Sequence, residues 1–184
     1  MNRQHDDVAY VLVSEQEIDK ITTEIANKIS EDFKDEEHVL LVGILKGSMP
    51  FMSDIIRKLS IPAEIDFMKV SSYGSGTVSS KETKIFLDLS RKNIDKCAII
   101  IIEDIIDSGF TLKNVVNHLY EMGAKSVHTC TMLDKPSRRE VDFTPDYTGR
   151  EIPNEFVIGY GLDYDEKYRT LPFIGVLDPK VYEN

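Results

Sequence analysis

The chain has 184 residues, of which 41% are hydrophobic, and it fits one globular domain over residues 1–184 with a sizeable core. Its formal net charge of -10 argues against a nucleic-acid-binding protein, because surfaces that bind nucleic acid are basic. The N-terminal residues lack a signal-peptide core and no apolar run reaches transmembrane length, which predicts a cytoplasmic protein with no membrane partner.

The first half of the chain alternates between helical and strand patterns. A capping-box pattern at Ser14, followed by isoleucines at helical spacing, predicts a helix that runs to about Phe33. Residues 38–45 form a short apolar run typical of a buried strand, and Pro50 suits the first turn of a second helix. The alternating residues 63–70 predict another strand.

The second half continues this alternation after a change in composition. Residues 71–83 are nearly all small or polar, which predicts a mobile loop. Residues 111–122 fit a helix that ends at Gly123. Further strands are predicted at residues 84–89, 97–103, 126–133, 156–159 and 173–177. Strands that alternate with helices predict an α/β fold with a central, mostly parallel sheet flanked by helices.

Residues suited to binding a charged ligand follow three of the predicted strands. Lys46 and Gly47 follow the first, Lys135 follows the strand at 126–133, and Glu103 and Asp104 come directly after four isoleucines. Ligands of open parallel sheets bind at the carboxyl ends of the strands. The sequence therefore predicts that these residues lie on one rim of the sheet.

The residues after the isoleucine run have the composition of a phosphate cradle. Glycine at 109 lets a ligand approach the backbone, Ser108 and Thr111 supply hydroxyls, and the following helix supplies amides at its positive end. An ordinary turn between a strand and a helix has similar residues. The upstream acids Glu103 and Asp104 repel phosphate, so they need another partner, such as sugar hydroxyls or a cation.

Residues 103–112 resemble the phosphoribosyl diphosphate motif of the type I phosphoribosyltransferases. With Lys135 and residues 156–163, the match becomes specific to purine enzymes. The rest of the chain resembles the bacterial hypoxanthine (6-oxopurine) phosphoribosyltransferases, and this resemblance covers almost the whole chain. It implies the type I fold with a mobile lid loop at about 71–83. It also implies a small hood, built from about residue 150 to the C-terminus together with the N-terminal segment.

The activity implied by the resemblance is purine salvage. The 5-phosphoribosyl group of phosphoribosyl diphosphate passes to hypoxanthine, and also to guanine, with release of pyrophosphate. Mg²⁺ is the implied cofactor. The implied partners are these small-molecule substrates and further copies of the chain in a homodimer or homotetramer.

The resemblance also assigns roles to individual residues. Asp107 is the implied catalytic residue, a general base that contacts the purine. The implied ribose and phosphate residues are Glu103, Asp104, Asp107, Ser108, Gly109, Phe110 and Thr111, and those for pyrophosphate are Lys46, Gly47 and Arg169. The implied lid residues are Ser72 and Tyr73, the purine residues are Lys135, Phe156, Val157 and Asp163, and the metal residues are Glu103, Asp104 and Asp163.

Several of these residues also have plainer explanations. Lys46 and Lys135 would otherwise be solvated loop lysines, and Phe156 a core residue. In the family, Lys135 donates to the 6-oxo group, which disfavours adenine because the adenine 6-amino group is itself a donor. The family also places a cis peptide between Leu45 and Lys46.

Two other classes of function use acids at strand ends or a related fold. A regulator with this fold that binds RNA would need a basic patch, which the acidic composition opposes. A phosphoacceptor signalling domain would explain Glu103 and Asp104, but it would leave the cradle at 108–111 and the loop at 71–83 without a role.

Overall fold

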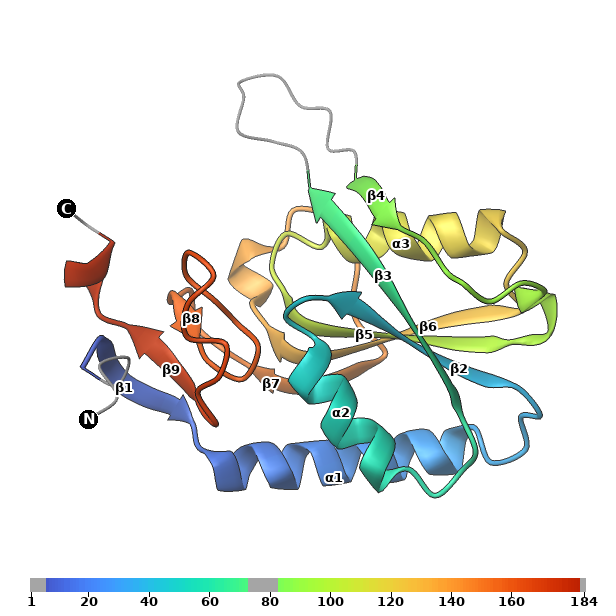
Figure 1. The fold of residues 1–184 in the computed structure, drawn as a ribbon, viewed down its shortest axis with the longest axis horizontal. Coiled ribbons are helices and arrows are strands. Elements are labelled where there is room, and N and C mark those ends of the chain that lie inside the picture. The colour runs from blue at the N-terminus through green and yellow to red at the C-terminus, as the bar shows by residue number, and fades with distance from the viewer. Residues whose placement is uncertain (1–5, 73–82, 183–184) are drawn as a thin grey trace.

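A six-stranded sheet lies at the centre of the computed structural model, which describes residues 6–72 and 83–182 (Figure 1). Its strands are Val39–Leu45 (β2), Glu64–Ser72 (β3), Thr83–Leu87 (β4), Ala98–Ile106 (β5), Ser126–Asp134 (β6) and Tyr147–Glu151 (β7). The spatial order is β4-β3-β2-β5-β6-β7, and all neighbours are parallel except β3 and β4.

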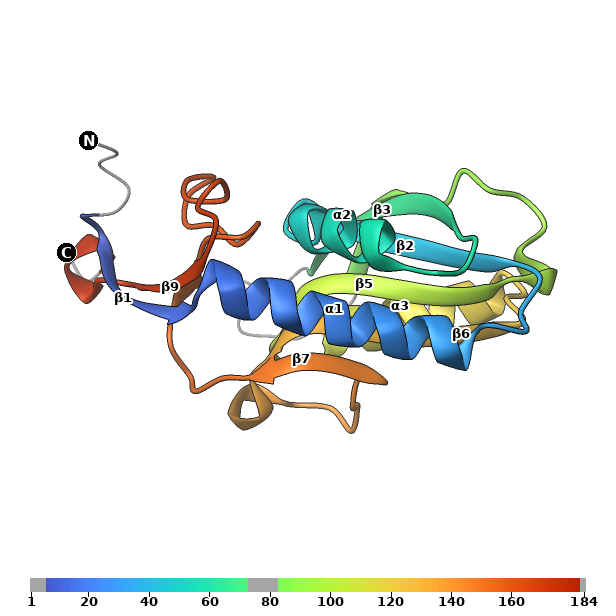
Figure 2. The ribbon, with the colours of Figure 1, turned by 90° about the horizontal axis from the view of Figure 1, so that it is seen from below.

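Helices cover both faces of this sheet (Figures 1 and 2). Helices Glu15–Asp32 (α1) and Met49–Lys58 (α2) pack on one face, and helix Phe110–Glu121 (α3) packs on the other. Short 3₁₀ helices at Ile94–Lys96, Pro136–Arg138 and Pro179–Val181 lie outside these elements. The predicted α/β fold with a mostly parallel sheet and flanking helices is confirmed.

The isoleucine run explains why the sheet is covered on both sides. Ile100 and Ile102 belong to the hydrophobic cluster that contains α1 and α2, whereas Ile99 and Ile101 belong to the cluster of α3. All four side chains are fully buried. A strand that is buried on both faces is apolar at every position, so β5 has a continuous run of isoleucines instead of an alternating pattern.

Two helix ends form as the sequence predicts. Ser14 Oγ accepts a hydrogen bond from the Glu17 amide at 3.2 Å, and the Glu17 carboxylate accepts one from the Ser14 amide at 2.8 Å. This capping box starts α1. After α3, Gly123 takes the left-handed conformation with φ 92°, which is the conformation typical of a glycine that ends a helix.

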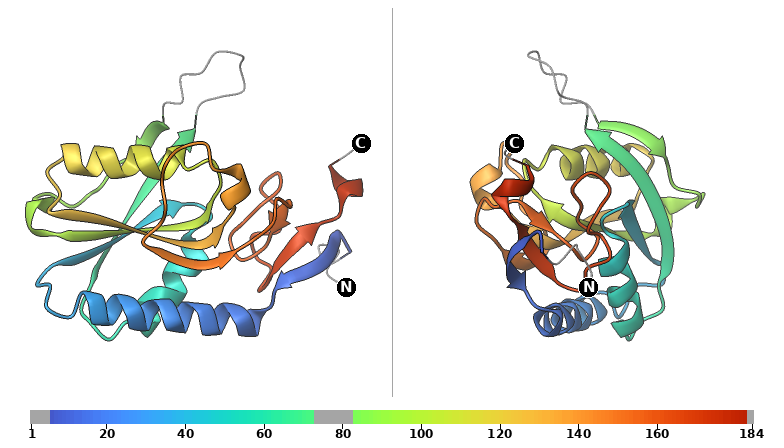
Figure 3. Two further views of the ribbon diagram at one scale, coloured as in Figure 1. Left: turned by 180° about the vertical axis from the view of Figure 1, so that it is seen from behind. Right: turned by 60° about the vertical axis from the view of Figure 1, so that its left-hand side comes forward.

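A second, three-stranded antiparallel sheet lies beside the central sheet (Figure 3). It has the order β1-β9-β8, with β1 at Val8–Val13, β8 at Val157–Ile158 and β9 at Ile174–Leu177. This hood sheet joins segments from the two ends of the chain, as the resemblance implies. None of the helices in the described part of the chain is long and apolar enough to span a membrane.

The structure corrects several predicted boundaries. The strand predicted at residues 97–103 continues to Ile106, because β6 pairs with it until Ile106 lies opposite Asp134. Helix α3 begins at Phe110, one residue before the predicted start. Strands β1 and β7 were not predicted. Ser72 ends β3, whereas Tyr73 and most of the predicted lid loop lie outside the described residues.

Candidate active site

A cleft of about 660 Å³ lies at the carboxyl ends of β2 and β5. Of the residues that the sequence places on this rim, Lys46, Gly47, Glu103 and Asp104 line the cleft, whereas Lys135 does not. The predicted site residues that line it are Lys46, Gly47, Glu103, Asp104, Asp107, Ser108, Gly109, Thr111, Asp163 and Arg169. Arg138 and Glu140, for which the sequence predicts no role, line it too.

Gly47, in the loop after β2, lies directly against the Asp104 side chain of β5. A Cβ atom on Gly47 would lie 1.5 Å from Asp104 Oδ2, so no larger residue fits there without moving the carboxylate. The peptide bond between Leu45 and Lys46 is cis, as the resemblance implies. The β2–α2 loop, residues 46–48, therefore lies directly against Asp104 of β5.

Glu103, which is buried, and Asp104, which is half-buried, form an acidic pair near the end of β5. Burial raises the pKa of Glu103 well above its ordinary value, and the neighbouring Asp104 charge raises it further. Burial also raises the pKa of Asp104, although the Ile105 amide donates a hydrogen bond to its Oδ1 at 2.8 Å. Such a pair gains from hydroxyl donors or a divalent cation, because either one compensates the buried negative charge.

Replacement of Glu103 by glutamine is expected to stabilise the free protein and to impair its activity. The folded-state pKa of Glu103 is raised, so its ionisation destabilises the fold as the pH rises through that pKa. At pH 8 we expect Glu103→Gln to increase the free energy of unfolding by about 0.5–2 kcal/mol. Each kcal/mol of added stability should raise the melting temperature by about 2–4 °C.

This stabilisation should shrink as the pH is lowered toward 5, because wild-type Glu103 then takes up its proton. Thermal melts at both pH values measure the difference. Glu121→Gln, the same change at an exposed residue near the end of α3, serves as the control. Equal stability of wild type and Glu103→Gln at pH 8 would contradict the unfavourable burial of this charge.

Two adjacent arginines hold Asp107. The carboxylate of Asp107 forms an ion pair with Arg138, with 3.2 Å between Oδ1 and Nε. Arg139 Nη1 donates to the carbonyl oxygen of Asp107, and Arg139 Nη2 pairs with the carboxylate of Asp134. The Arg139 and Asp134 side chains are largely buried, so they fix the backbone of Asp107. No role for these arginines follows from the sequence, where their place just after Lys135 is the only signal.

The predicted phosphate cradle forms the turn from β5 into α3. Gly109 has φ 88°, and a Cβ atom there would lie 2.9 Å from Val141 Cγ2 and 3.0 Å from Arg139 Cδ. Ser108 and Thr111 line the cleft beside it, whereas Phe110 does not. The first amides of a helix have no partner within the helix, so the start of α3 is suited to an anion.

Two cations, Lys46 and Arg169, face these acids and the cradle across the cleft. Lys46 Nζ lies 3.0 Å from Glu166 Oε2, and Arg169 Nη2 lies 2.8 Å from Asp163 Oδ1. The hydrogen bond from Lys46 lowers the pKa of the exposed Glu166 carboxyl. Arg169 Nε is buried and has no hydrogen-bond partner within the described residues. An anionic ligand would provide acceptors for both side chains.

Three residues implied for purine binding lie outside the lining of this cleft. Lys135 is 8% exposed, burial lowers its pKa, and its amide donates to the carbonyl of Ile106 at 3.0 Å. It is therefore a buried lysine beside the end of β5. Phe156 is 40% exposed and stacks on Tyr182 at 5.4 Å, so it is not a core residue. Val157 is buried in β8.

The acids of the cleft fit Mg²⁺ that is bound together with a phosphate ligand. Glu103, Asp104 and Asp163 line the same cleft, but residues 6–72 and 83–182 contain no group of three or more His, Cys, Asp or Glu placed to bind a metal. Mg²⁺ usually takes one or two carboxylates together with water and phosphate oxygens. The donor set therefore suits a metal shared with a diphosphate better than a metal held by the protein alone.

Comparisons with known proteins show the family of the chain. A family model for the phosphoribosyl transferase domain matches residues 12–165. The chain is 49% identical to the hypoxanthine-guanine phosphoribosyltransferase of Bacillus subtilis (strain 168), over 97% of this chain and 98% of that protein. A crystal structure of a hypoxanthine phosphoribosyltransferase from Staphylococcus aureus covers 100% of both chains, with a TM-score of 0.95 and 45% identity. The chain therefore belongs to the phosphoribosyltransferase family and, within it, to the hypoxanthine phosphoribosyltransferases.

Proposed function

We propose that this enzyme transfers the 5-phosphoribosyl group of phosphoribosyl diphosphate to hypoxanthine, and also to guanine, in a Mg²⁺-dependent reaction of purine salvage. The products are IMP or GMP and pyrophosphate. One observation carries the proposal, namely that a single cleft combines an acidic pair, a phosphate cradle and two cations. These groups match the hydroxyls, the 5′-phosphate and the diphosphate of the sugar substrate. The relatives' names, which include hypoxanthine and guanine, support the choice of base.

In this proposal the acids and the cradle bind the sugar. Glu103 and Asp104 accept hydrogen bonds from the ribose 2′- and 3′-hydroxyls, which orients C1′ for attack. Their negative charges also stabilise the positive charge that develops on the sugar in the transition state. The 5′-phosphate binds Ser108, the amides at the start of α3 and Thr111.

The cations bind the leaving group. Lys46 and Arg169 exchange their present carboxylate partners for pyrophosphate oxygens, and Gly47 supplies backbone that the diphosphate can approach closely. When bound, Mg²⁺ would take one or two of the Asp163, Glu103 and Asp104 carboxylates as ligands, together with phosphate oxygens, and would neutralise charge on the departing pyrophosphate.

Asp107 and the residues around Lys135 act on the base. A purine nitrogen attacks C1′, the bond from C1′ to the pyrophosphate oxygen breaks, and the N7 proton passes to Asp107. Lys135 donates to the 6-oxo group, Phe156 stacks on the ring, and the backbone of Val157 pairs with the edge of the base. Buried groups that match the 6-oxo acceptor in this way discriminate strongly against a base that lacks it.

The assembly and location of the enzyme complete the proposal. We infer a homodimer or homotetramer in the cytoplasm. A solved structure of Trypanosoma cruzi hypoxanthine phosphoribosyl transferase concerns the role of the C-terminal region of that protein in its oligomeric state, which supports this inference. Sedimentation of the purified enzyme would measure its mass in solution.

Removal of Mg²⁺ is expected to abolish turnover. IMP formation from hypoxanthine and phosphoribosyl diphosphate would be followed with Mg²⁺, after addition of a chelator, and after Mg²⁺ is restored in excess. We expect the rate to fall to background and to recover, because the described residues supply too few ligands to retain the metal against a chelator. An unchanged rate in the chelator would contradict the proposed metal dependence.

A further inference from the structure

The turn at residues 159–162 follows β8 of the hood sheet and contacts the β2–α2 loop. Gly159, Tyr160 and Gly161 all have positive φ, at 92°, 49° and 98°. A Cβ atom on Gly161 would lie 1.9 Å from the carbonyl oxygen of Gly47, so the two backbones are in direct contact. A shift of this turn would therefore change the cleft at Gly47.

The same turn also positions Arg169. The Gly161 amide donates to the carbonyl of Arg169 at 3.0 Å, and Arg169 Nη1 donates to the carbonyl of Gly161 at 2.8 Å. This reciprocal pair ties Arg169 to the turn, and the turn rests on Gly47. The distance between the two proposed pyrophosphate-binding segments therefore depends on where the turn lies.

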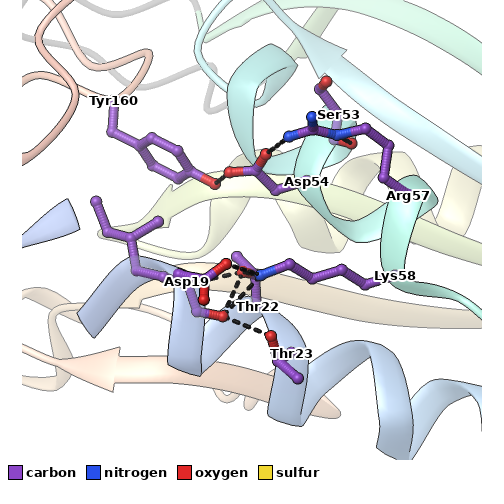
Figure 4. Close-up of polar contacts among 9 residues, drawn as sticks. Asp19, Thr22, Thr23, Ser53, Asp54, Arg57, Lys58 and Tyr160 are labelled. Atoms are coloured by element: carbon purple, nitrogen blue, oxygen red, sulfur yellow. Dashed lines mark hydrogen bonds and ion pairs between the residues drawn. The ribbon is translucent and has the colours of Figure 1, made fainter. Parts of the chain in front are cut away.

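Tyr160 anchors this turn to helix α2. Its side chain is 8% exposed, and its hydroxyl donates to Asp54 Oδ2 at 2.6 Å (Figure 4). Burial and the hydrogen bond to Asp54 raise the pKa of Tyr160, which keeps the phenol protonated as a donor. The other oxygen of Asp54 pairs with Arg57. Neither Tyr160 nor Asp54 lines the cleft.

Helix α2 is itself fixed to α1 by Lys58, one turn after Asp54 on the same face of the helix. Figure 4 shows Lys58 reaching α1, where its Nζ lies 2.6 Å from Asp19 Oδ1 and 2.7 Å from Thr22 Oγ1. Asp54 therefore belongs to a helix that is fixed to α1. The hydrogen bond from Tyr160 to Asp54 therefore also fixes the turn relative to α1.

We propose that Tyr160 and Asp54 are positioning residues for pyrophosphate binding, because their hydrogen bond holds the turn at residues 159–162, and with it Arg169, against Gly47. The proposal rests on the pyrophosphate role proposed above for Lys46, Gly47 and Arg169. Its readouts are the KM for phosphoribosyl diphosphate and the inhibition constant of pyrophosphate, since both depend on this half of the cleft.

The central test is Tyr160→Phe, which removes the hydroxyl and keeps the ring. We expect the KM for phosphoribosyl diphosphate and the inhibition constant of pyrophosphate to rise about threefold to tenfold, the factor that one buried hydrogen bond supplies. The KM for hypoxanthine should not change. Asp54→Ala should match this effect, and the double variant should add little to either single variant. Asp54→Asn keeps an acceptor oxygen and should restore most of the affinity.

Tyr147→Phe is the matched control. Tyr147 is 6% exposed and donates to Asp32 Oδ2 at 2.7 Å, and this bond joins β7 to α1. Neither residue lines the cleft. Thermal melts should show that Tyr147→Phe and Tyr160→Phe destabilise the fold similarly, while Tyr147→Phe leaves both pyrophosphate readouts unchanged.

A further variant separates the two proposals. If Arg169→Gln raises the inhibition constant of pyrophosphate while Tyr160→Phe leaves it unchanged, the positioning role is overturned and the pyrophosphate site stands. If Arg169→Gln leaves this constant unchanged, the pyrophosphate assignment itself is overturned. Equal shifts in Tyr160→Phe and Tyr147→Phe would also overturn the positioning role, because they would reflect a general loss of stability.

Discussion

Replacement of Asp107 by asparagine is expected to lower kcat about 100- to 10,000-fold, the range that a general acid or base contributes. Asparagine keeps the shape of the side chain and is unable to take the purine proton. The contact between Arg139 and the Asp107 carbonyl uses the backbone, so it should survive the change and hold the turn in place. Steady-state formation of IMP at saturating substrates measures this loss.

Asp95→Asn provides the control for this prediction. Asp95 is exposed and lies just before β5, at the opposite end of the strand from Asp107. The same chemical change there should leave kcat unaltered. Wild-type turnover in Asp107→Asn would show that the purine proton leaves by another route, and Asp107 would then be a turn residue without a catalytic role.

Lys135→Met is expected to lower kcat/KM for hypoxanthine by up to about 10⁴-fold, while the low activity toward adenine changes little. Methionine preserves most of the apolar stem of the lysine and removes the donor to the 6-oxo group. Burial lowers the pKa of Lys135, which shows that its charge is unfavourable in the free protein. The variant should therefore remain folded, and loss of activity would reflect lost recognition of the base.

Lys113→Met tests whether removal of any lysine has this effect. Lys113 is exposed on α3, and its replacement should change neither kcat/KM nor the preference for hypoxanthine over adenine. The ratio of kcat/KM for the two bases is the decisive quantity. An unaltered ratio in Lys135→Met would contradict the role of Lys135 in selecting 6-oxopurines.

Local sequence patterns predicted the parts of the fold that depend on burial and helix ends. Four successive isoleucines indicated β5, and Ser14 indicated the start of α1. The patterns failed where pairing with a distant strand decides the structure. β5 continues beyond residue 103 to Ile106 because β6 lies beside it. β1 is half exposed and pairs with β9 at the other end of the chain, which no local pattern reveals.

For the candidate site, too, the sequence predicted some features and missed those that depend on distant partners. The rule that ligands bind at the carboxyl ends of parallel strands predicted one rim for Lys46, Glu103, Asp104 and Lys135; the first three share one cleft, and Lys135 lies outside its lining. The residues that support the site could not be predicted in this way, because their partners are distant in sequence. Arg139 acts on the backbone of Asp107, and Tyr160 reaches Asp54 on another element. Only the folded chain brings these groups together.

The most direct test of the proposed function is a panel of bases. The purified enzyme, Mg²⁺ and phosphoribosyl diphosphate would be mixed in turn with hypoxanthine, guanine, xanthine, adenine and uracil, and nucleotide formation would be followed. We predict turnover of hypoxanthine above that of the other bases, no appreciable turnover of adenine or uracil, and loss of the hypoxanthine activity in Lys135→Met. An absence of turnover with every 6-oxopurine would contradict the proposal and leave the cleft as a binding site for phosphoribosyl diphosphate.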